Sequence, residues 1–370
     1  MPPILGFVIE GDLQPGFLGV GQSTARAIAL RSARSGRLQR TLLVHVPAGA
    51  GKAAFVDDLL ALLLCTDAAA DERPCNHCRA CRQARAHSHP DLVIGSPQRW
   101  REERGSGESI VAAARRWLLE SSGSPIAGER RVVVIDKVDQ ANEQAQNALL
   151  KVLEEPGERQ MLILVADEPS RLLPTIRSRA QPLRIGAVPR DELVAWLVDR
   201  ERLPADRADA LARMAGGLSG RATELARDSE LVAWRRRTQQ ELLELLGRGT
   251  ADRFGSIRDL LDAAARVTTA TPPADDEPVS AGAQRGAAVV VVDAWLDLGR
   301  DLLVARAGRP AIAPATELLT GLAAAAGRIG QAELLACMRK LERIREGLLQ
   351  NAAPKLAMEV AMLAWPSVNG

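Results

Sequence analysis

The sequence predicts an α/β domain built on a parallel five-stranded sheet, followed by a small helical domain and a larger all-helical one. Five short apolar runs rich in β-branched residues mark the first half of the chain, and helical patterns lie between them. Runs of this length suit strands buried on both faces, and their alternation with helices predicts a doubly wound parallel sheet. The runs cover residues 41–46, 91–95, 131–136, 161–166 and 181–185.

Two helical patterns in this half have clear limits. Residues 53–64 follow a glycine-rich loop and have the pattern of an apolar helix. Residues 141–154 form the second pattern, in which Asn142 can cap the first turn and Pro156 prevents continuation. The apolar stripe of this second helix consists of Ala145, Ala148, Leu149, Val152 and Leu153.

The second half of the chain predicts helices alone. Strand signals end at about Val188, and the short helices that follow are broken by Pro204 and by the pair Gly216-Gly217. Longer amphipathic helices come next, interrupted by a Pro-, Asp-, Ala- and Gly-rich stretch at 271–286 that predicts a flexible insertion. We therefore expect three domains, at 1–186, 187–229 and 230–370.

Composition and charge exclude several classes of protein. A length of 370 residues exceeds one compact domain, and 46% hydrophobic with 25% charged residues is typical of a folded chain. A net charge of +2 does not favour a strongly basic nucleic-acid binder. The N-terminus lacks a secretory signal pattern, and the apolar stretches are shorter than the roughly 20 residues that span a bilayer. We expect a cytoplasmic protein without membrane segments.

Four cysteines in one short segment predict a structural zinc site. Cys65, Cys75, Cys78 and Cys81 follow the pattern C-x9-C-x2-C-x2-C. Four thiolates complete the tetrahedral shell of Zn²⁺ in closed sites, which fold a loop and do not activate water. The alternatives are unconnected cysteines, or three cysteines joined by one of the histidines at 77, 87 and 89. The fifth cysteine, Cys337, is expected to be an ordinary buried side chain.

A glycine-rich loop lies between the first predicted strand and the helix after it, which is the setting of a phosphate-binding loop. Gly49, Gly51 and Lys52 are its candidate binding residues. Against the pattern G-x4-G-K-[ST], Val46 replaces the first glycine and Ala53 replaces the hydroxyl residue that binds Mg²⁺. A chance glycine-rich turn is the alternative.

The strand at 131–136 carries a second altered motif. It resembles a Walker B strand that ends in a metal-side aspartate, Asp136. In AAA+ ATPases the next residue is usually a glutamate that polarises the attacking water, whereas here it is Lys137, which has no basic lone pair at neutral pH. Ala53 and Lys137 together predict that the chain's own site does not hydrolyse ATP. Whether ATP or ADP still binds there is left open.

These pieces resemble the clamp-loader branch of the AAA+ superfamily over most of the chain. Val20-Gly21-Gln22 is similar to the start of its ATPase domains, and the cysteine cluster is similar to the zinc module of the bacterial subunits. The segment 147–156, Asn-Ala-Leu-Leu-Lys-Val-Leu-Glu-Glu-Pro, is close to the family's signature helix. Residues 173–180 resemble the Ser-Arg-Cys segment with Ala180 in place of cysteine, and 351–356 resemble a closing motif of the collar domain.

The resemblance implies a fold and a role. It implies a P-loop AAA+ core with a zinc-binding insertion, a helical lid, and a C-terminal collar domain for oligomerisation. A degenerate phosphate loop beside an intact Ser-Arg pair is typical of the delta-prime group of bacterial DNA polymerase III, a DNA-directed DNA polymerase. In that group Arg179 would be an arginine finger for ATP bound by an adjacent motor subunit. Arg221 would be the lid's sensor arginine or a vestige of it, and Asp167 departs from the usual Thr or Asn of sensor 1.

The implied partners are the motor (tau/gamma) and delta subunits of a heteropentamer, the sliding clamp, and primer-template DNA. Two other functions remain alternatives. One is an ATP-hydrolysing tau/gamma-like motor subunit, and the other is a zinc-dependent DNA-binding module. For Arg179 itself, an ordinary surface salt bridge is the alternative.

Overall fold

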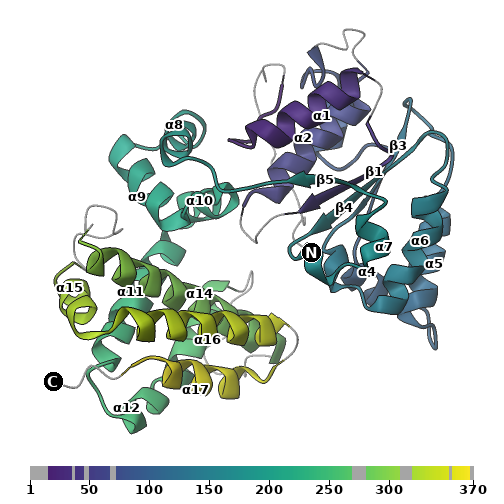
Figure 1. Cartoon of the computed structure of the whole chain (residues 1–370). Coiled ribbons are helices and arrows are strands. Elements are labelled where there is room, and N and C mark those ends of the chain that lie inside the picture. Colours follow the sequence, from purple (N-terminus) through teal and green to yellow (C-terminus); the bar gives the residue numbers. More distant parts are fainter. Residues whose placement is uncertain are drawn as a thin grey trace. The chain divides into compact units, whose positions relative to one another are not determined.

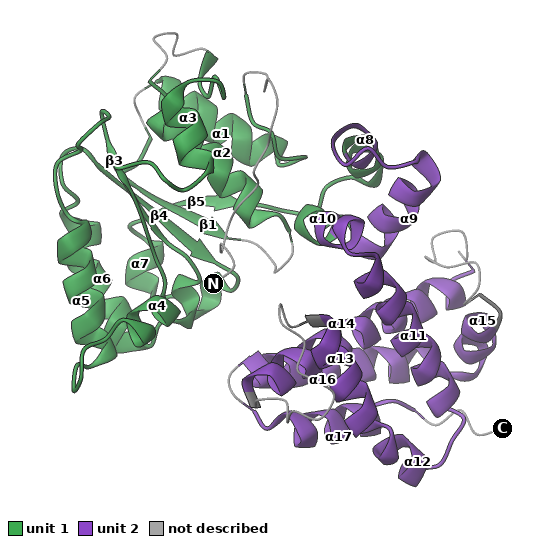
Figure 2. Cartoon of the chain, turned by 180° about the vertical axis from the view of Figure 1, so that it is seen from behind, with its two compact units in different colours: residues 1–196, 216–221 green, residues 197–215, 222–370 purple. Residues whose placement is uncertain are grey.

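A computed structural model of the chain describes residues 16–35, 38–45, 50–66, 72–268, 281–308, 319–349 and 352–366. The chain divides into two compact units (Figure 2). Unit 1 comprises Met1–Trp196 and Gly216–Arg221, and unit 2 comprises Leu197–Ala215 and Ala222–Gly370. The lid expected at 187–229 contributes residues to both units, and the division into three domains stays a prediction.

Unit 1 contains the predicted parallel sheet, with strand order β2-β3-β4-β1-β5. All four neighbouring pairs are parallel. The five predicted runs are thus confirmed as strands, each to within one or two residues. The strands are β1 (Thr41–His45), β2 (Leu92–Gly95), β3 (Arg131–Ile135), β4 (Gln160–Ala166) and β5 (Gln181–Arg184).

Helices cover both faces of the sheet (Figure 1), which is why β1, β3 and β4 are mainly apolar. Alternate residues of one strand enter different cores: Leu42 and Val44 pack on one face, whereas Leu43 packs on the other. The first face is covered by α1 (Ser23–Arg34) and α2 (Lys52–Leu64), beside which lies α3 (Arg79–Arg85). The second is covered by α4 (Pro97–Glu102), α5 (Ile110–Ser121), α6 (Glu143–Glu154) and α7 (Pro174–Arg177).

Helix α6 begins and ends where the sequence predicts. The Asn142 side chain accepts a hydrogen bond from the backbone N–H of Ala145 at 2.9 Å, which satisfies one of the donors at the helix start. The helix ends at Glu154, two residues before Pro156. On the predicted stripe, Leu149 and Leu153 are buried.

The segment Val20-Gly21-Gln22 packs against the residues that follow β5 and holds the start of α1 there. The Gln22 side chain exchanges two hydrogen bonds with the backbone of Gly186, at 2.8 and 2.9 Å. Gly21 has a φ of +67°, and a Cβ atom there would come within 2.6 Å of Val188. The glycine is therefore required by both backbone conformation and close packing.

Unit 2 is helical in its described residues, and α14 (Ala281–Arg306) packs against five of its other helices. Val292, Trp295 and Leu302 are fully buried along α14. The flexible insertion predicted at 271–286 is wrong for residues 281–286, which form the start of this alanine-rich helix; residues 269–280 lie outside the described residues. The five helices are α11 (Ser229–Leu245), α13 (Ile257–Thr268), α15 (Leu319–Arg328), α16 (Gln331–Leu349) and α17 (Pro354–Ala364).

The remaining helices are α8 (Arg190–Arg200), α9 (Ala205–Ala215), α10 (Ser219–Arg227) and α12 (Thr250–Gly255), and two 3-10 turns, η2 (Val138–Gln140) and η3 (Pro169–Arg171), lie in unit 1. Among the described helices, none is long and apolar enough to cross a membrane.

Candidate functional site

The described part of the phosphate loop opens α2. Gly51 is the N-cap residue of that helix with a φ of +81°, and Lys52 is the first helical residue. A Cβ atom at Gly51 would come within 2.3 Å of the Ser219 hydroxyl oxygen, so both the backbone conformation and the packing require glycine. The predicted binding residue Gly49 and the replacement at Val46 lie outside the described residues.

Lys52 forms an ion pair with Asp167, the residue that follows β4. The sheet explains the meeting, because β1 and β4 are parallel neighbours whose carboxyl ends reach the same edge. The Lys52 side chain is 16% exposed and that of Asp167 is 27% exposed. Burial lowers the pKa of Lys52, and the nearby carboxylates of Asp136 and Asp139 oppose that shift.

Asp136 and Asp139 bring two more buried carboxyl groups to this edge of the sheet. Burial raises the pKa of Asp136, and the charges of Lys137 and Lys52 act against that rise. Asp139 accepts a hydrogen bond from the backbone N–H of Glu168 at 3.0 Å, while its other oxygen is buried without a hydrogen-bond partner among the described residues. The region is therefore acidic around the half-buried Lys52.

Lys137 follows Asp136 in a left-handed conformation, with a φ of +51°, and its side chain is exposed. At this position a carboxylate could polarise a water molecule, whereas an ammonium group cannot accept its proton. Ala53, in the first turn of α2, offers only a methyl group where a hydroxyl would bind Mg²⁺. The two residues whose chemistry opposes hydrolysis, Ala53 and Lys137, thus lie at the same edge of the sheet.

The start of α10 contacts the phosphate loop within unit 1. The Ser219 hydroxyl donates a hydrogen bond to the carbonyl oxygen of Ala50 at 3.3 Å. Arg221 lies two residues further along α10 and is half-buried. Its role as a sensor arginine stays a prediction.

Arg179 lies in the turn after α7, and its side chain is 38% exposed. Its guanidinium forms an ion pair of 2.8 Å with Glu154, the last residue of α6, and donates to the carbonyl oxygen of Thr175 at 3.1 Å. The next residue, Ala180, is buried and anchors the turn in the core. Arg179 is therefore an accessible cation held at the surface of a fixed turn.

Gln146 is a positioning residue that the sequence reasoning missed. Its amide group donates to the carbonyl oxygens of Ala141 and Arg171, and its side-chain oxygen accepts from the backbone N–H of Leu173 at 2.9 Å. The side chain is buried, so α6 is joined through it to the segment that leads to Arg179. A polar residue three positions before Leu149, on the buried face of α6, was the available signal.

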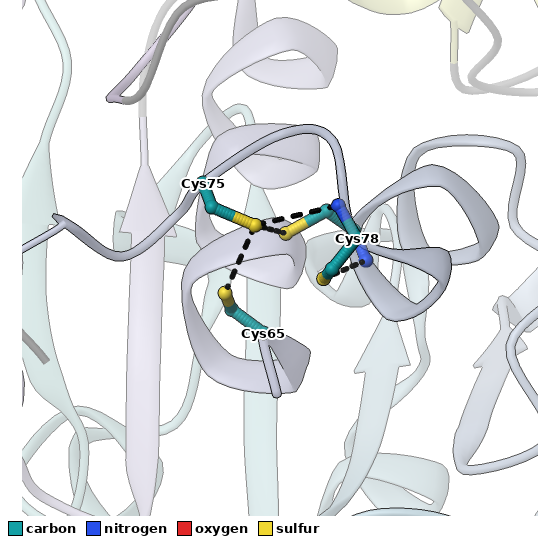
Figure 3. A group of neighbouring side chains, drawn as sticks. Cys65, Cys75 and Cys78 are labelled. Atoms are coloured by element: carbon teal, nitrogen blue, oxygen red, sulfur yellow. Dashed lines mark hydrogen bonds between the residues drawn. The ribbon is translucent and has the colours of Figure 1, made fainter. Parts of the chain in front are cut away.

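The four predicted ligand cysteines converge near the end of α2 and the start of α3. Figure 3 shows the thiol groups of Cys65, Cys75 and Cys78 pointing toward one another. All four sulfur atoms lie within 4.8 Å of each other, with 3.6 Å between Cys65 and Cys75 and 3.9 Å between Cys75 and Cys81. A tetrahedral ion with bonds of about 2.3 Å requires sulfur atoms about 3.8 Å apart. The cluster therefore fits a four-thiolate metal ion.

The histidines proposed as alternative ligands have other contacts. His77 Nδ1 lies 2.9 Å from the carbonyl oxygen of Cys75, and His87 Nε2 lies 2.7 Å from a carboxyl oxygen of Asp57. His89 is buried beside Asp91 and accepts that residue's backbone N–H. Among the described residues, the group that could hold a metal ion consists of the four cysteines.

The protein environment prepares one thiol of the cluster for metal binding. Burial opposes ionisation of Cys78, but hydrogen bonds from the backbone N–H groups of Cys81 and Thr66 lower its pKa to about 6. Burial raises the pKa of Cys75 and of Cys81. Such buried thiols ionise when a cation replaces the protons, so binding would release protons.

A buried hydrogen-bond network joins the cysteine cluster to the chain before α1. Asn76 donates to the carbonyl oxygen of Gly16 at 2.7 Å and accepts from Arg85 on α3. Arg85 also donates to Asp58 of α2 at 2.9 Å. Through Arg85 and Asp58, the cluster is therefore joined to α2, the helix that begins at Lys52.

Comparisons with known proteins show which proteins this chain resembles. The family model described as "DNA polymerase III, delta subunit" matches residues 21–189. The DNA polymerase III subunit delta' of Pseudomonas aeruginosa is 35% identical over 195 residues, which are 51% of this chain and 57% of that relative. The DNA polymerase III subunit gamma/tau of Mycobacterium tuberculosis is 28% identical over 95% of this chain and 61% of its own length.

The chain thus spans less than two thirds of the length of these two curated relatives. A solved structure described as a DNA polymerase III gamma subunit-related protein from Thermotoga maritima covers 91% of this chain and 98% of its own, with 17% identity and a TM-score of 0.37. The matched residues 21–189 contain the sheet, the altered phosphate loop, the cysteine cluster and Arg179. Through residues 21–189, just under half of its length, the chain is delta-prime-like and resembles subunits of the DNA polymerase III clamp loader.

Proposed function

We propose that this chain is a non-hydrolysing subunit of a bacterial sliding-clamp loader that supplies Arg179 to the ATP site of an adjacent motor subunit. The observation that carries the proposal is a contrast within unit 1. The chain's own nucleotide site has Ala53 in α2 and Lys137 after β3, where metal ligation and water activation need a hydroxyl and a carboxylate. Arg179, on a different segment, remains an accessible guanidinium on an anchored turn.

Arginine suits a trans role for physical reasons. Its guanidinium is always charged and can donate two parallel hydrogen bonds to phosphate oxygens. Charge grows on the transferred phosphoryl group during hydrolysis, so a fixed cation stabilises the transition state more than the bound nucleotide. In the isolated chain Glu154 pairs with this guanidinium; a phosphate carries more charge and would replace that partner.

The proposal also assigns partners and a metal. Unit 2 would be the collar through which the chain assembles with tau/gamma and delta subunits in a heteropentamer that places the sliding clamp on primer-template DNA in the cytoplasm. The cysteine cluster would hold one structural Zn²⁺, because four thiolates without an open position suit that ion. Elemental analysis should find about one zinc per chain; purified chain without bound metal contradicts this part.

A direct experiment replaces the arginine in a reconstituted loader. Arg179→Ala should leave the chain folded and assembled, while ATP turnover at the adjacent motor site falls by roughly 10³-fold or more. Arg177→Ala is the matched control, because Arg177 is an exposed arginine on the same turn. Unchanged DNA- and clamp-stimulated turnover in Arg179→Ala, with normal assembly, would remove this residue from the mechanism.

The zinc-dependent DNA-binding alternative has less support than the loader assignment. Residues 21–189, which contain the cysteine cluster, match the family described as "DNA polymerase III, delta subunit", and the net charge of the chain is +2. Titration of the isolated chain onto primed DNA tests it directly, and tight, salt-sensitive binding would favour that alternative.

A further inference from the structure

The Lys52–Asp167 ion pair lies where a nucleotide phosphate would be expected to bind. Lys52 opens α2 directly after the phosphate loop, and in such loops this lysine is the side chain that meets the phosphates. Its ammonium group instead contacts the carboxylate of Asp167. The pair is largely shielded from water, since the side chains are 16% and 27% exposed.

The fold fixes Asp167 in this place. Ala166 ends β4 and pairs in register with His45 at the end of β1, so Asp167 emerges at the carboxyl edge of the sheet, where it meets Lys52 at the start of α2. The next residue, Glu168, is fixed by the hydrogen bond from its backbone N–H to buried Asp139. The backbone that carries Asp167 is therefore supported on both sides.

The neighbouring charges add to the effect of this pair. Asp136 and Asp139 are both buried close enough to Lys52 to influence it. An incoming phosphate would have to separate Lys52 from a carboxylate and then remain beside several negative groups. Like charges at such short range repel each other, and solvent around Asp167 weakens this repulsion without removing it.

We propose that Asp167 is an internal lock that neutralises Lys52 and excludes nucleotide phosphates from the chain's own site. The inference rests on the proposed function, in which this loop descends from a nucleotide site, and it names the side chain that closes that site. Ala53 and Lys137 remove the chemistry of hydrolysis, whereas Asp167 acts earlier by opposing binding. The carboxylate acts on Lys52 and has no part in the trans role of Arg179.

The same ion pair could instead be a resting contact that any nucleotide displaces without penalty. The two cases differ in how affinity responds to the charge at position 167. If the carboxylate is a lock, removing its charge should strengthen phosphate binding, and the gain should require Lys52. If the contact is incidental, removing the charge should leave affinity unchanged.

The experiment measures ADP binding to the full chain by calorimetry, with fluorescent ADP as a second readout. Asp167→Asn keeps the side-chain shape and removes the charge, and it should bind ADP about tenfold to a hundredfold more tightly than wild type. Adding Lys52→Ala to that variant should abolish the gain. Glu168→Gln is the matched control, because this carboxylate is adjacent in sequence and pairs with Arg171 instead; it should bind ADP as wild type does.

Equal ADP affinity in wild type and Asp167→Asn, with both chains folded by circular dichroism, would overturn the lock. A gain that persists without Lys52 would also overturn it, since the charge would then act elsewhere. Neither result bears on Arg179. The Arg179→Ala comparison in the reconstituted loader tests the proposed function separately, so the two can fail independently.

Discussion

Replacing Asp58 by asparagine should loosen unit 1 near the cysteine cluster. The Asp58 side chain is completely buried and accepts hydrogen bonds from the backbone N–H groups of Leu18 and Gly19, at 2.9 and 3.0 Å, and from Arg85 at 2.9 Å. An asparagine keeps one acceptor oxygen, but its NH2 group is a hydrogen-bond donor and would face N–H groups that are also donors. Asp58→Asn therefore breaks contacts on α2 and leaves the Arg85 guanidinium without its counter-ion.

The expected magnitude follows from these contacts. Removing one partner of a buried ion pair costs about 3–5 kcal/mol, because the remaining charge stays buried. Arg85 still donates to Asn76 at 2.7 Å, so we expect the lower end, about 3 kcal/mol. At about 1.4 kcal/mol per factor of ten, this corresponds to about a hundredfold rise in the population of the opened unit.

Hydrogen exchange measured by mass spectrometry resolves the two units, which a single unfolding curve does not. Peptides from α2 and β1 should exchange about a hundredfold faster in Asp58→Asn, while peptides from α14 of unit 2 remain unchanged. Glu102→Gln provides the control, because Glu102 is exposed and its carboxylate accepts a hydrogen bond from the exposed side chain of Gln98. Exchange in α2 that matches wild type would refute the reasoning.

Two further predictions concern side chains that fix loops of unit 1. Gln146→Ala should destabilise unit 1 by about 2 kcal/mol, because buried hydrogen bonds are lost. The segment at Leu173 would also lose its hydrogen bond to this side chain, so the ATPase activity of the adjacent motor subunit that depends on Arg179 should fall. A reconstituted loader with normal turnover would contradict this positioning role. Burial opposes ionisation of Asp91, but backbone N–H groups of residues 126–128 donate to it and lower its pKa. Because the pKa of Asp91 is lower in the folded chain, wild type should have a higher free energy of unfolding than Asp91→Asn above the unfolded pKa of about 3.9. This difference should shrink as the pH falls below that value, and denaturation curves at a series of pH values measure it.

The strands and α6 could be predicted from sequence because their signals are local. An apolar run of five residues and an Asn142 cap depend on neighbouring residues alone, and the structure has them at the expected places. The insertion predicted at 271–286 is too long because residues 281–286 contain no proline, and their two glycines do not stop α14, which is held by the burial of the residues that follow.

The site could be predicted in part. The cysteines are close in sequence, so their spacing was informative, and Lys52 and Arg179 lie in recognisable motifs. The partners of these residues are distant in sequence: Asp167 is 115 residues from Lys52, and Gln146 is 27 residues from Leu173. Such pairs depend on strand order and on the register of β1 with β4, which composition and periodicity do not encode.

The most direct test of the account is an ATPase measurement on the purified single chain with Mg²⁺. The account predicts turnover no greater than that of Lys52→Ala, because Ala53 cannot bind the metal and Lys137 cannot activate water. Mg²⁺-dependent hydrolysis that disappears in Lys52→Ala would contradict it and would make the chain a motor subunit.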